Sequence, residues 1–212
     1  MEINIQKRVL AKNESDADRN RAFFKEKQVF VLNMMSSPGS GKTETLCRTL
    51  EALMPDIRMG VIVGDICTTN DADRLSVTGA KVTQINTDQF GGDCHLAAHL
   101  IESSARSLGC DDLDLLIVEN IGNLVCPAEF DIGEDARAVV LSVPEGEDKP
   151  LKYPLMFQVA DAAILNKIDL LPYLDFDAAL AVENMGKVHP GMPVFELSDR
   201  KSTRLNSSHV SQ

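Results

Sequence analysis

The chain has 212 residues, which is enough for one domain of ordinary size. Hydrophobic residues make up 44% of the sequence and charged residues 25%, a composition typical of folded proteins and not of disordered ones. The 32 acidic residues outnumber the 21 basic ones and give a net charge of −11, so we expect no nucleic-acid partner. No apolar run approaches the ~18 residues of a membrane helix, and the N-terminus lacks the apolar core of a signal peptide. We therefore expect no membrane contact and a cytoplasmic location.

Helix and strand patterns alternate along almost the whole chain. Residues 5–27 are charged with sparse apolar positions, which predicts one helix or two short ones on the surface of the domain or on a partner. The apolar run QVFVLNMM at 28–35 predicts a buried strand. Further strands are expected at 58–63, 81–85, 113–118, 138–143, 162–165 and 194–197, and helices at 43–54, 71–78, 96–108, 153–157 and 176–186. This alternation is typical of an α/β fold, a mostly parallel sheet with helices on both faces.

A phosphate-binding loop follows the first predicted strand. Its sequence is SSPGSGKT, a P-loop with Ser36 where the usual pattern has its first glycine. The two later glycines let backbone N–H groups turn around a phosphate, and the next helix begins at the same anion. Lys42 is expected to contact the β- and γ-phosphates, and the Thr43 hydroxyl to coordinate Mg²⁺. The fold class is therefore a P-loop NTPase, with nucleotide-binding residues Gly39, Ser40, Gly41, Lys42 and Thr43.

A guanine-reading pattern, NKxD, follows the strand predicted at 162–165. The carboxylate of Asp169 can accept two N–H bonds, from the ring N1 and the exocyclic amine of guanine. Adenine lacks both donors and would leave a buried carboxylate unpaired, which is a strong penalty. Asn166 is expected on the far side of the base and the Lys167 stem across its face. The pattern predicts that the nucleotide is GTP.

Two carboxylates end predicted strands at the edge of the sheet where the P-loop lies. Asp65 closes VIVGD and Glu119 closes LLIVE, and ligands bind at the carboxyl ends of parallel strands. Alternatively, both acidic residues only cap the ends of their strands and face water. We favour Asp65 as a Mg²⁺ ligand and Glu119 as a residue that orders a Mg²⁺-bound water, while the N–H of Gly122 meets the γ-phosphate. Lys42, Asp65 and Glu119 are thus the candidate catalytic residues, in loops ordered by the γ-phosphate.

A cysteine–histidine set is the candidate metal site. The five cysteines are an odd number without a CxxC pair, so we expect no disulfide framework and mostly buried thiols. Cys94 and His95 are adjacent, and Cys126 lies in the loop after Glu119. Thiolate and imidazole suit Ni²⁺ or Zn²⁺, and three ligands suit a labile site or one completed by a second subunit. The alternative is a purely structural role, in which the cysteines are simply buried and His95 and His99 simply lie on one face of a helix.

Several longer motifs together resemble one family. These are SSPGSGKT, GDICTTNDADR, CHL, ENIGNLVCP, FDIGE, EGEDKPLKYP and NKIDLLPYLDF. They are similar to the HypB family, the nickel-incorporation GTPases of hydrogenase maturation, from the first strand to Ser198. Ser36 is the usual residue of that family. The resemblance implies a GTP-hydrolysing metallochaperone that helps insert nickel into [NiFe]-hydrogenase, and it puts the metal site on Cys94, His95 and Cys126.

The resemblance also implies partners and shows departures. It implies homodimerisation, a nickel-binding chaperone partner and the large subunit of [NiFe]-hydrogenase. The Cys-rich or His-rich N-terminal stretch of many members is not in this sequence, and Ala97 stands where an aspartate is usual. The last guanine-side loop of the family continues past its serine, whereas here residues 197–198 run into a polar, serine-rich stretch.

That final stretch, 199–212, is expected to be either a disordered tail or a foreign sequence. Residues 199–209 resemble a translated sequencing adapter, which indicates that the natural C-terminus was lost. We therefore divide the chain into an N-terminal helical segment (1–27), a C-terminally truncated P-loop GTPase domain (28–198) and a tail that does not look native.

Three other functions stay open on the sequence alone. A urease-type nickel accessory GTPase shares the nucleotide motifs but fits the Cys94–His95 pair and EGEDKPLKYP poorly. A passive nickel- or zinc-binding protein with vestigial GTPase activity is the alternative of another class. A P-loop kinase would need a pocket for an acceptor substrate, which the sequence does not identify.

Overall fold

The computed structural model describes residues 2–54, 56–65, 70–87 and 94–198. The tail at 199–212 and Cys67 lie outside these ranges. In the described part of the chain, no helix has both the length and the apolar character that crossing a bilayer requires.

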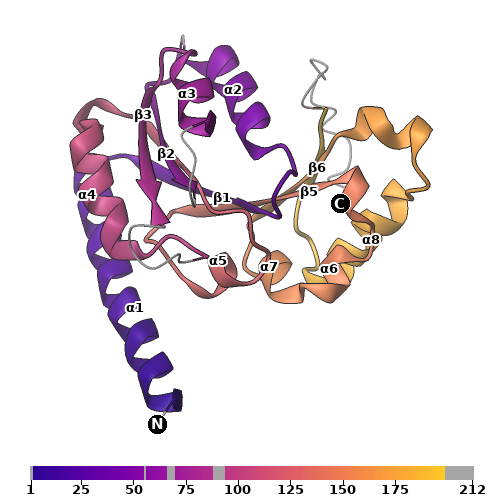
Figure 1. The fold of residues 1–212 in the computed structure, drawn as a ribbon, viewed down its shortest axis with the longest axis horizontal. Helices are drawn as coiled ribbons and strands as arrows, with labels where there is room; N and C mark the ends of the chain where they lie inside the picture. The colour runs from indigo at the N-terminus through magenta and orange to yellow at the C-terminus, as the bar shows by residue number, and fades with distance from the viewer. Residues whose placement is uncertain (1, 55, 66–69, 88–93, 199–212) are drawn as a thin grey trace.

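Seven parallel strands form one sheet at the centre of the molecule (Figure 1). Their spatial order is β3-β2-β4-β1-β5-β6-β7, so the strand that precedes the P-loop lies in the middle. Every paired strand runs parallel to its neighbour. The strands are β1 (Phe30–Ser36), β2 (Met59–Asp65), β3 (Lys81–Asn86), β4 (Leu115–Glu119), β5 (Ala136–Ser142), β6 (Ala162–Asn166) and β7 (Val194–Glu196). All seven predicted strands are confirmed, and the sheet is parallel as expected.

The helices that follow β1 lie in the connections between successive strands, as parallel pairing requires, and one more helix precedes β1. They are α1 (Glu2–Lys27), α2 (Lys42–Leu53), α3 (Asn70–Ser76), α4 (Ala98–Leu108), α5 (Cys126–Glu129), α6 (Lys149–Lys152), α7 (Pro154–Gln158) and α8 (Ala178–Val188), with 3-10 turns η2 (Cys110–Asp112), η3 (Val143–Glu145) and η4 (Ile168–Tyr173). The helix predicted at 153–157 corresponds to α7. The short α5 and α6 were not expected.

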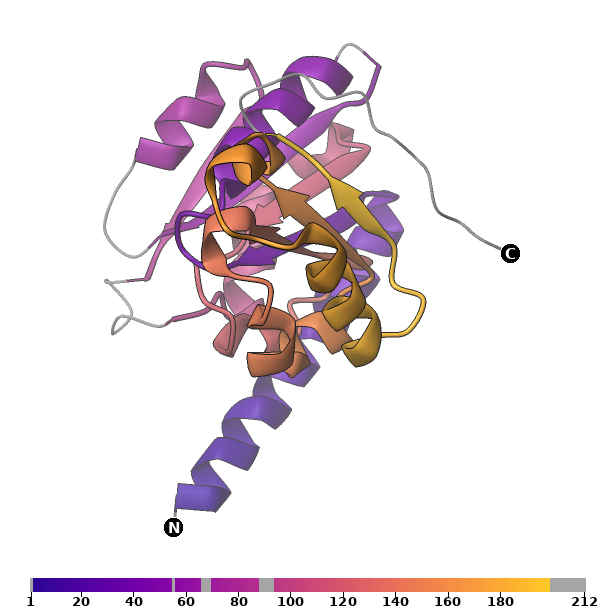
Figure 2. The same cartoon turned by 90° about the vertical axis from the view of Figure 1, so that its right-hand side faces the viewer.

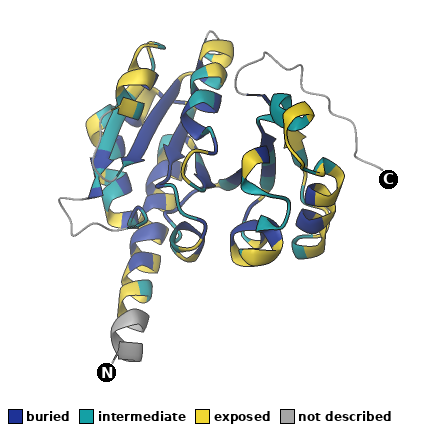
Figure 3. Ribbon diagram, turned by 45° about the vertical axis from the view of Figure 1, so that its right-hand side comes forward, coloured by how far each residue is buried: buried dark blue, intermediate teal, exposed yellow. Residues whose placement is uncertain are grey.

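The strands are mostly buried (Figure 3). Alternation along them divides the core between the two faces of the sheet. Met34 of β1 packs with α2 and α3 on one face. Val31 and Met35 point to the opposite face, Val31 toward α1 and α4, and Met35 toward α7 and α8. Between these last two clusters, on the same face, β1 carries the fully buried Asn33. A buried polar residue therefore separates the two apolar clusters on this side of the sheet.

The N-terminal segment is one continuous helix, α1. Its C-terminal part is buried through Phe23 and Phe24, which join the core cluster that contains Ile101 of α4. The Arg106 guanidinium lies 4.2 Å from the centre of the Phe23 ring. The first turns of α1 extend beyond the rest of the molecule (Figures 1 and 2). The helix is thus held at one end by the domain.

Candidate functional site

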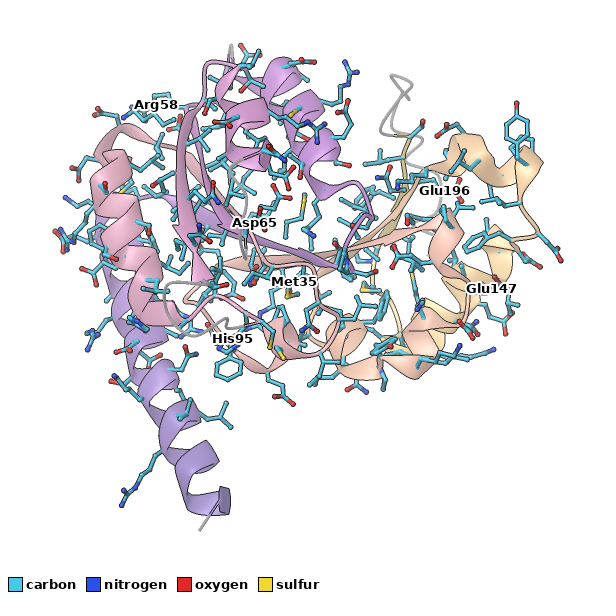
Figure 4. The ribbon with its side chains drawn as sticks, in the orientation of Figure 1. Met35, Arg58, Asp65, His95, Glu147 and Glu196 are labelled. Carbon is cyan, nitrogen blue, oxygen red and sulfur yellow. The ribbon has the colours of Figure 1, made fainter. Side chains whose placement is uncertain are left out.

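A pocket of about 370 Å³ opens at the carboxyl edge of the sheet. Its walls are the P-loop, the ends of β2 and β4 and the start of α3. Asp65, at the end of β2, lies near the middle of the molecule (Figure 4). The pocket is lined by the predicted residues Gly39, Ser40, Gly41, Lys42, Thr43, Asp65, Glu119 and Gly122. One cleft therefore contains every nucleotide-site residue that the sequence predicted, apart from the NKxD segment.

Three glycines are required by the shape of the P-loop and its neighbour. Gly39 and Gly41 have φ angles of +75° and +96°, in the left-handed region that other residues adopt only with strain. Gly122 has a different reason. A Cβ atom there would lie 2.8 Å from the Cα of Pro38, so only glycine lets the loop after β4 approach the P-loop this closely.

Ser36 organises the lysine of the P-loop. Its Oγ accepts hydrogen bonds from Lys42 Nζ at 2.7 Å and from Ser40 Oγ at 2.6 Å, and it donates to the carbonyl of Ser37 at 2.7 Å. Lys42 is buried, and this burial lowers the pKa of its ammonium group. A glycine at position 36 would supply no such partner. The sequence singled out Ser36 only as a departure and did not predict this contact.

Thr43 and Glu119 form the polar centre of the pocket. The Thr43 hydroxyl donates to Glu119 Oε1 at 2.7 Å, and Glu119 is only 3% exposed. Burial raises the pKa of Glu119 to about 7. Its second oxygen, Oε2, is buried and has no hydrogen-bond partner among the described residues. A hydroxyl and two carboxylates, those of Glu119 and Asp65, are the oxygen donors that Mg²⁺ prefers, so these residues fit that ion.

The NKxD segment is bonded directly to the P-loop, although none of its described residues lines the pocket. Asn166 Nδ2 donates to the Ser40 carbonyl at 2.9 Å, and Lys167 Nζ donates to the Gly39 carbonyl at 2.6 Å. Lys167 has a φ of +61°, an uncommon left-handed conformation that turns the chain at the end of β6. Asp169 Oδ1 accepts a 2.5 Å hydrogen bond from Ser198 Oγ.

The predicted metal ligands are brought together in part. The sulfurs of Cys94 and Cys126 lie 2.6 Å apart, although they are 32 residues apart in the chain, and both cysteines are free. The His95 ring stacks on Phe130 at a centroid distance of 3.6 Å (Figure 4). Within the described ranges, no group of three or more His, Cys, Asp or Glu side chains could hold a metal ion. The structure therefore supplies a pair of thiols, while the imidazole of the next residue, His95, stacks on Phe130.

The two thiols influence each other. Two effects raise the pKa of the Cys126 thiol to about 11. The larger is the hydrogen bond with Cys94, and the second is burial. A divalent cation between the sulfurs would have to displace these protons, because thiolates and not thiols bind metals. The cluster suits a soft transition metal and excludes a hard ion such as Mg²⁺.

Among the pocket residues that were not selected from the sequence, Arg74 and Asn120 bear most on its chemistry. Arg74 lines the pocket and bonds to Glu44 Oε2 at 2.6 Å, so it adds a second cation beside Lys42. It belongs to the motif GDICTTNDADR, and that motif is the signal that could have identified it. Asn120 also lines the pocket and is 1% exposed. It belongs to the motif ENIGNLVCP and directly follows an apolar strand, and these are the signals that could have identified it.

Comparison with known proteins agrees with this geometry. The chain matches the family described as "CobW/HypB/UreG, nucleotide-binding domain" over residues 30–196. It is 49% identical to the hydrogenase maturation factor HypB of Rhizobium leguminosarum bv. viciae, over 98% of this chain and 69% of that protein. It is also 49% identical to the HypB of Azotobacter vinelandii, over 93% of this chain and 64% of that protein. The chain thus spans about two thirds of the length of these relatives.

The fold matches a solved HypB structure. The crystal structure of HypB from Helicobacter pylori in complex with nickel superposes with a TM-score of 0.83 and 41% sequence identity, over 90% of this chain and 88% of that one. The similarity to HypB proteins, in sequence and in fold, extends over nearly the whole described chain. The chain therefore belongs to the HypB family of hydrogenase maturation factors, within the CobW/HypB/UreG group of nucleotide-binding domains.

Proposed function

We propose that the chain binds GTP with Mg²⁺ and hydrolyses it to GDP and phosphate. The observation that carries this proposal is the direct bonding of the NKxD segment to the P-loop, through Lys167 to the Gly39 carbonyl and Asn166 to the Ser40 carbonyl. This contact supports a base-reading segment and a phosphate-binding loop that serve one nucleotide. Family membership supports the same assignment.

Each residue of the pocket has a role in this proposal. Lys42 leaves Ser36 and binds the β- and γ-phosphates, with Gly39, Ser40 and Gly41 supplying backbone N–H groups. Mg²⁺, held by Thr43 with Asp65, would neutralise charge that develops on the phosphates. Glu119 orders water beside that ion, and the Gly122 N–H meets the γ-phosphate. Water is the nucleophile, so the protein contributes positioning and charge stabilisation.

The nickel role is proposed for the thiol cluster. Cys94 and Cys126, with His95 adjacent in the chain, would bind Ni²⁺ as cargo, and Zn²⁺ is the other soft-ligand candidate. Two thiols per chain leave a four-coordinate ion incomplete, so a second copy of the chain would supply the remaining ligands in a homodimer. We propose that this complex works in the cytoplasm with a nickel-binding chaperone and delivers nickel to the large subunit of [NiFe]-hydrogenase.

The experiment that tests the nucleotide assignment replaces the base-reading carboxylate. Asp169→Asn is expected to weaken GTP binding by at least about 100-fold, because the amide keeps one acceptor oxygen but turns an N–H donor toward the second N–H donor of guanine. An asparagine amide can donate to the extra oxygen of xanthine, so XTP should bind the variant better than GTP does. Titration calorimetry with GTP, XTP and ATP measures both effects. Asp148→Asn removes an exposed carboxylate paired with Lys152 and is the matched control. Unaltered GTP affinity in Asp169→Asn would refute the assignment.

The nickel assignment has its own measurement. Cys94→Ser and Cys126→Ser should each abolish the Ni²⁺–thiolate charge-transfer absorption, since a hydroxyl does not replace a thiolate as a soft ligand. Cys47→Ser is the control, because Cys47 contacts the carbonyl of Arg74 and not the cluster. A nickel signal that persists in both cluster variants would place the metal elsewhere.

A further inference from the structure

Asn120 joins the nucleotide pocket to the thiol cluster through its side chain. Its Oδ1 accepts the N–H of Ile121 at 2.9 Å and the N–H of Leu96 at 3.4 Å. Leu96 is two residues after Cys94. Asn120 itself stands between Glu119 and the Ile121–Gly122 segment, all of which line the pocket. The buried side-chain amide of Asn120 therefore contacts both the wall of the pocket and the backbone two residues after Cys94.

Leu96 has a second contact with the pocket wall. It is fully buried, and a Cβ atom placed on Gly64 would lie 2.8 Å from its Cγ and Cδ1. Gly64 lines the pocket and precedes Asp65. Leu96 is thus seated against the end of β2 and bonded to the loop after β4. These are the two segments that carry the predicted acidic residues of the nucleotide site.

The chain just after Leu96 is fixed from the other side. Asn13 of α1 accepts the N–H of Ala98 at 3.0 Å, and Asn20 of α1 donates to the Ala98 carbonyl at 2.8 Å. All of these contacts are buried. These bonds fix the start of α4 against α1 directly after Leu96.

The amide nitrogen of Asn120 is held by a second set of hydrogen bonds. Its Nδ2 donates to Asn33 Oδ1 at 3.2 Å, and Asn33 Nδ2 donates to Glu134 Oε1 at 3.0 Å. These bonds fix the orientation of the amide, so its Oδ1 must face Leu96 and Ile121. The longest bond of this set is the 3.4 Å contact to Leu96.

We propose that Asn120 is a positioning residue that couples the nucleotide state of the pocket to the metal affinity of Cys94 and Cys126, through the N–H of Leu96. Contact of the γ-phosphate with the Glu119–Gly122 segment moves the Asn120 backbone. The amide shifts Leu96, and the spacing of the two sulfurs changes with it. Coupling of this kind is a difference in nickel affinity between two nucleotide states. The inference rests on the proposed function, since it requires that both ligands bind.

The test measures nickel affinity in two nucleotide states. Dissociation constants for Ni²⁺ are obtained by competition with a chromophoric chelator, with Mg²⁺ and saturating GDP or a non-hydrolysable GTP analogue. In the unmodified chain we expect the two constants to differ by at least about fivefold. In Asn120→Ala the ratio should fall below about twofold, because the link to Leu96 is gone. The matched control is Asn184→Ala, another buried asparagine, which bonds the Glu147 carbonyl in the opposite half of the sheet and should keep the full ratio.

A second measurement needs no variant. Amide hydrogen exchange followed by NMR should show that the Leu96 N–H changes its exchange rate by at least about threefold between the GDP and analogue states. The N–H of Ala181 in α8 should exchange equally in both. An unchanged Leu96 rate, beside a nickel ratio above fivefold, would mean that the coupling follows another route and would overturn the proposal.

The outcomes separate this inference from the proposed function. Failure of the unmodified chain to bind GTP or Ni²⁺ would defeat the proposed function. Binding of both ligands with a nickel ratio of one, or with the same ratio in Asn120→Ala and the unmodified chain, would defeat only the role of Asn120. The role of Asn120 is supported if the two nickel dissociation constants become nearly equal in Asn120→Ala but still differ in Asn184→Ala. Loss of a buried amide by itself would affect both variants alike.

Discussion

A buried carboxyl group at the centre of the pocket has an unusual affinity for protons. Burial raises the pKa of Glu119 from an ordinary value of 4.5 to about 7, against the opposing effects of the Thr43 hydrogen bond and the charge of Lys42. The native state therefore holds a proton on Glu119 under conditions in which the unfolded chain has lost it. The contribution to stability is complete below the unfolded pKa and disappears as the pH rises through about 7.

This pKa predicts a pH dependence of stability in the nucleotide-free protein. Glu119→Gln removes the titration, so the free energy of unfolding of the variant relative to the unmodified chain should rise between pH 4.5 and pH 8 by on the order of 2–3 kcal/mol. Urea denaturation at several pH values measures the difference. Glu129→Gln, at an exposed position, should run parallel to the unmodified chain. Parallel curves for Glu119→Gln as well would mean that Glu119 is ionised in the native state.

Eight residues predicted for the nucleotide site line one cleft, for a topological reason. Lys42, Asp65 and Glu119 end or follow parallel strands, and the carboxyl ends of such strands meet at one edge. The sequence did not predict that Ser36 holds Lys42, or that Asn120 reaches Leu96. These contacts depend on side-chain directions between segments far apart in the chain, which neither periodicity nor a motif specifies.

At the scale of elements, α1 is attached to the domain by polar as well as apolar contacts. Asn20 Nδ2 donates to two carbonyls at 2.8 Å, those of Ala98 and Ile132, and Asn20 is 1% exposed. The sequence predicted a helix here but not its packing, because its apolar positions are sparse. Buried asparagines look like surface residues in a sequence, so the attachment could not be recognised.

The attachment of α1 predicts a large effect from one asparagine. Asn20→Ala leaves two buried carbonyl oxygens without their donor and should lower the free energy of unfolding by about 2–4 kcal/mol. Lys12→Ala, at an exposed position of the same helix, should change it by less than about 0.5 kcal/mol. Chemical denaturation followed by circular dichroism compares the two. An equally small effect at Asn20 would show that α1 is held by Phe23 and Phe24 alone.

Helix length explains which elements the sequence missed. The helices α5 and α6 have four residues each and carry a proline in their first turn, Pro127 and Pro150. Such a segment is too short for a 3.6-residue period to be visible and resembles a loop. The longer α2 and α4 were predicted within two residues of their boundaries, because their apolar faces repeat over several turns.

At the scale of the whole molecule, the segments that we propose to bind the nucleotide come from both halves of the sheet. The P-loop follows the central β1, while Asp65 comes from β2 on one side and the NKxD segment from β6 on the other. The sequence predicted parallel strands and a P-loop fold. The order β3-β2-β4-β1-β5-β6-β7 is a property of long-range pairing, and local patterns contain no information on it.

A ligand that contacts segments from both halves should stabilise the whole fold. GTP with Mg²⁺ at about 100 times its dissociation constant should add about 2.7 kcal/mol to the free energy of unfolding. For a chain of this size, that corresponds to a rise in Tm of about 5–10 °C in differential scanning fluorimetry. ATP should give no comparable rise. Lys42→Ala should lose most of the shift, because the phosphates lose their main cation, and a full shift in that variant would contradict the role of Lys42.

The bonds from Lys167 and Asn166 to the P-loop carbonyls join only atoms of the protein itself. They restrain the two loops against each other, which lowers the entropic penalty of ordering them when a ligand binds. Such preorganisation favours rapid association and leaves the lifetime of each nucleotide complex to the departure rate of the phosphates.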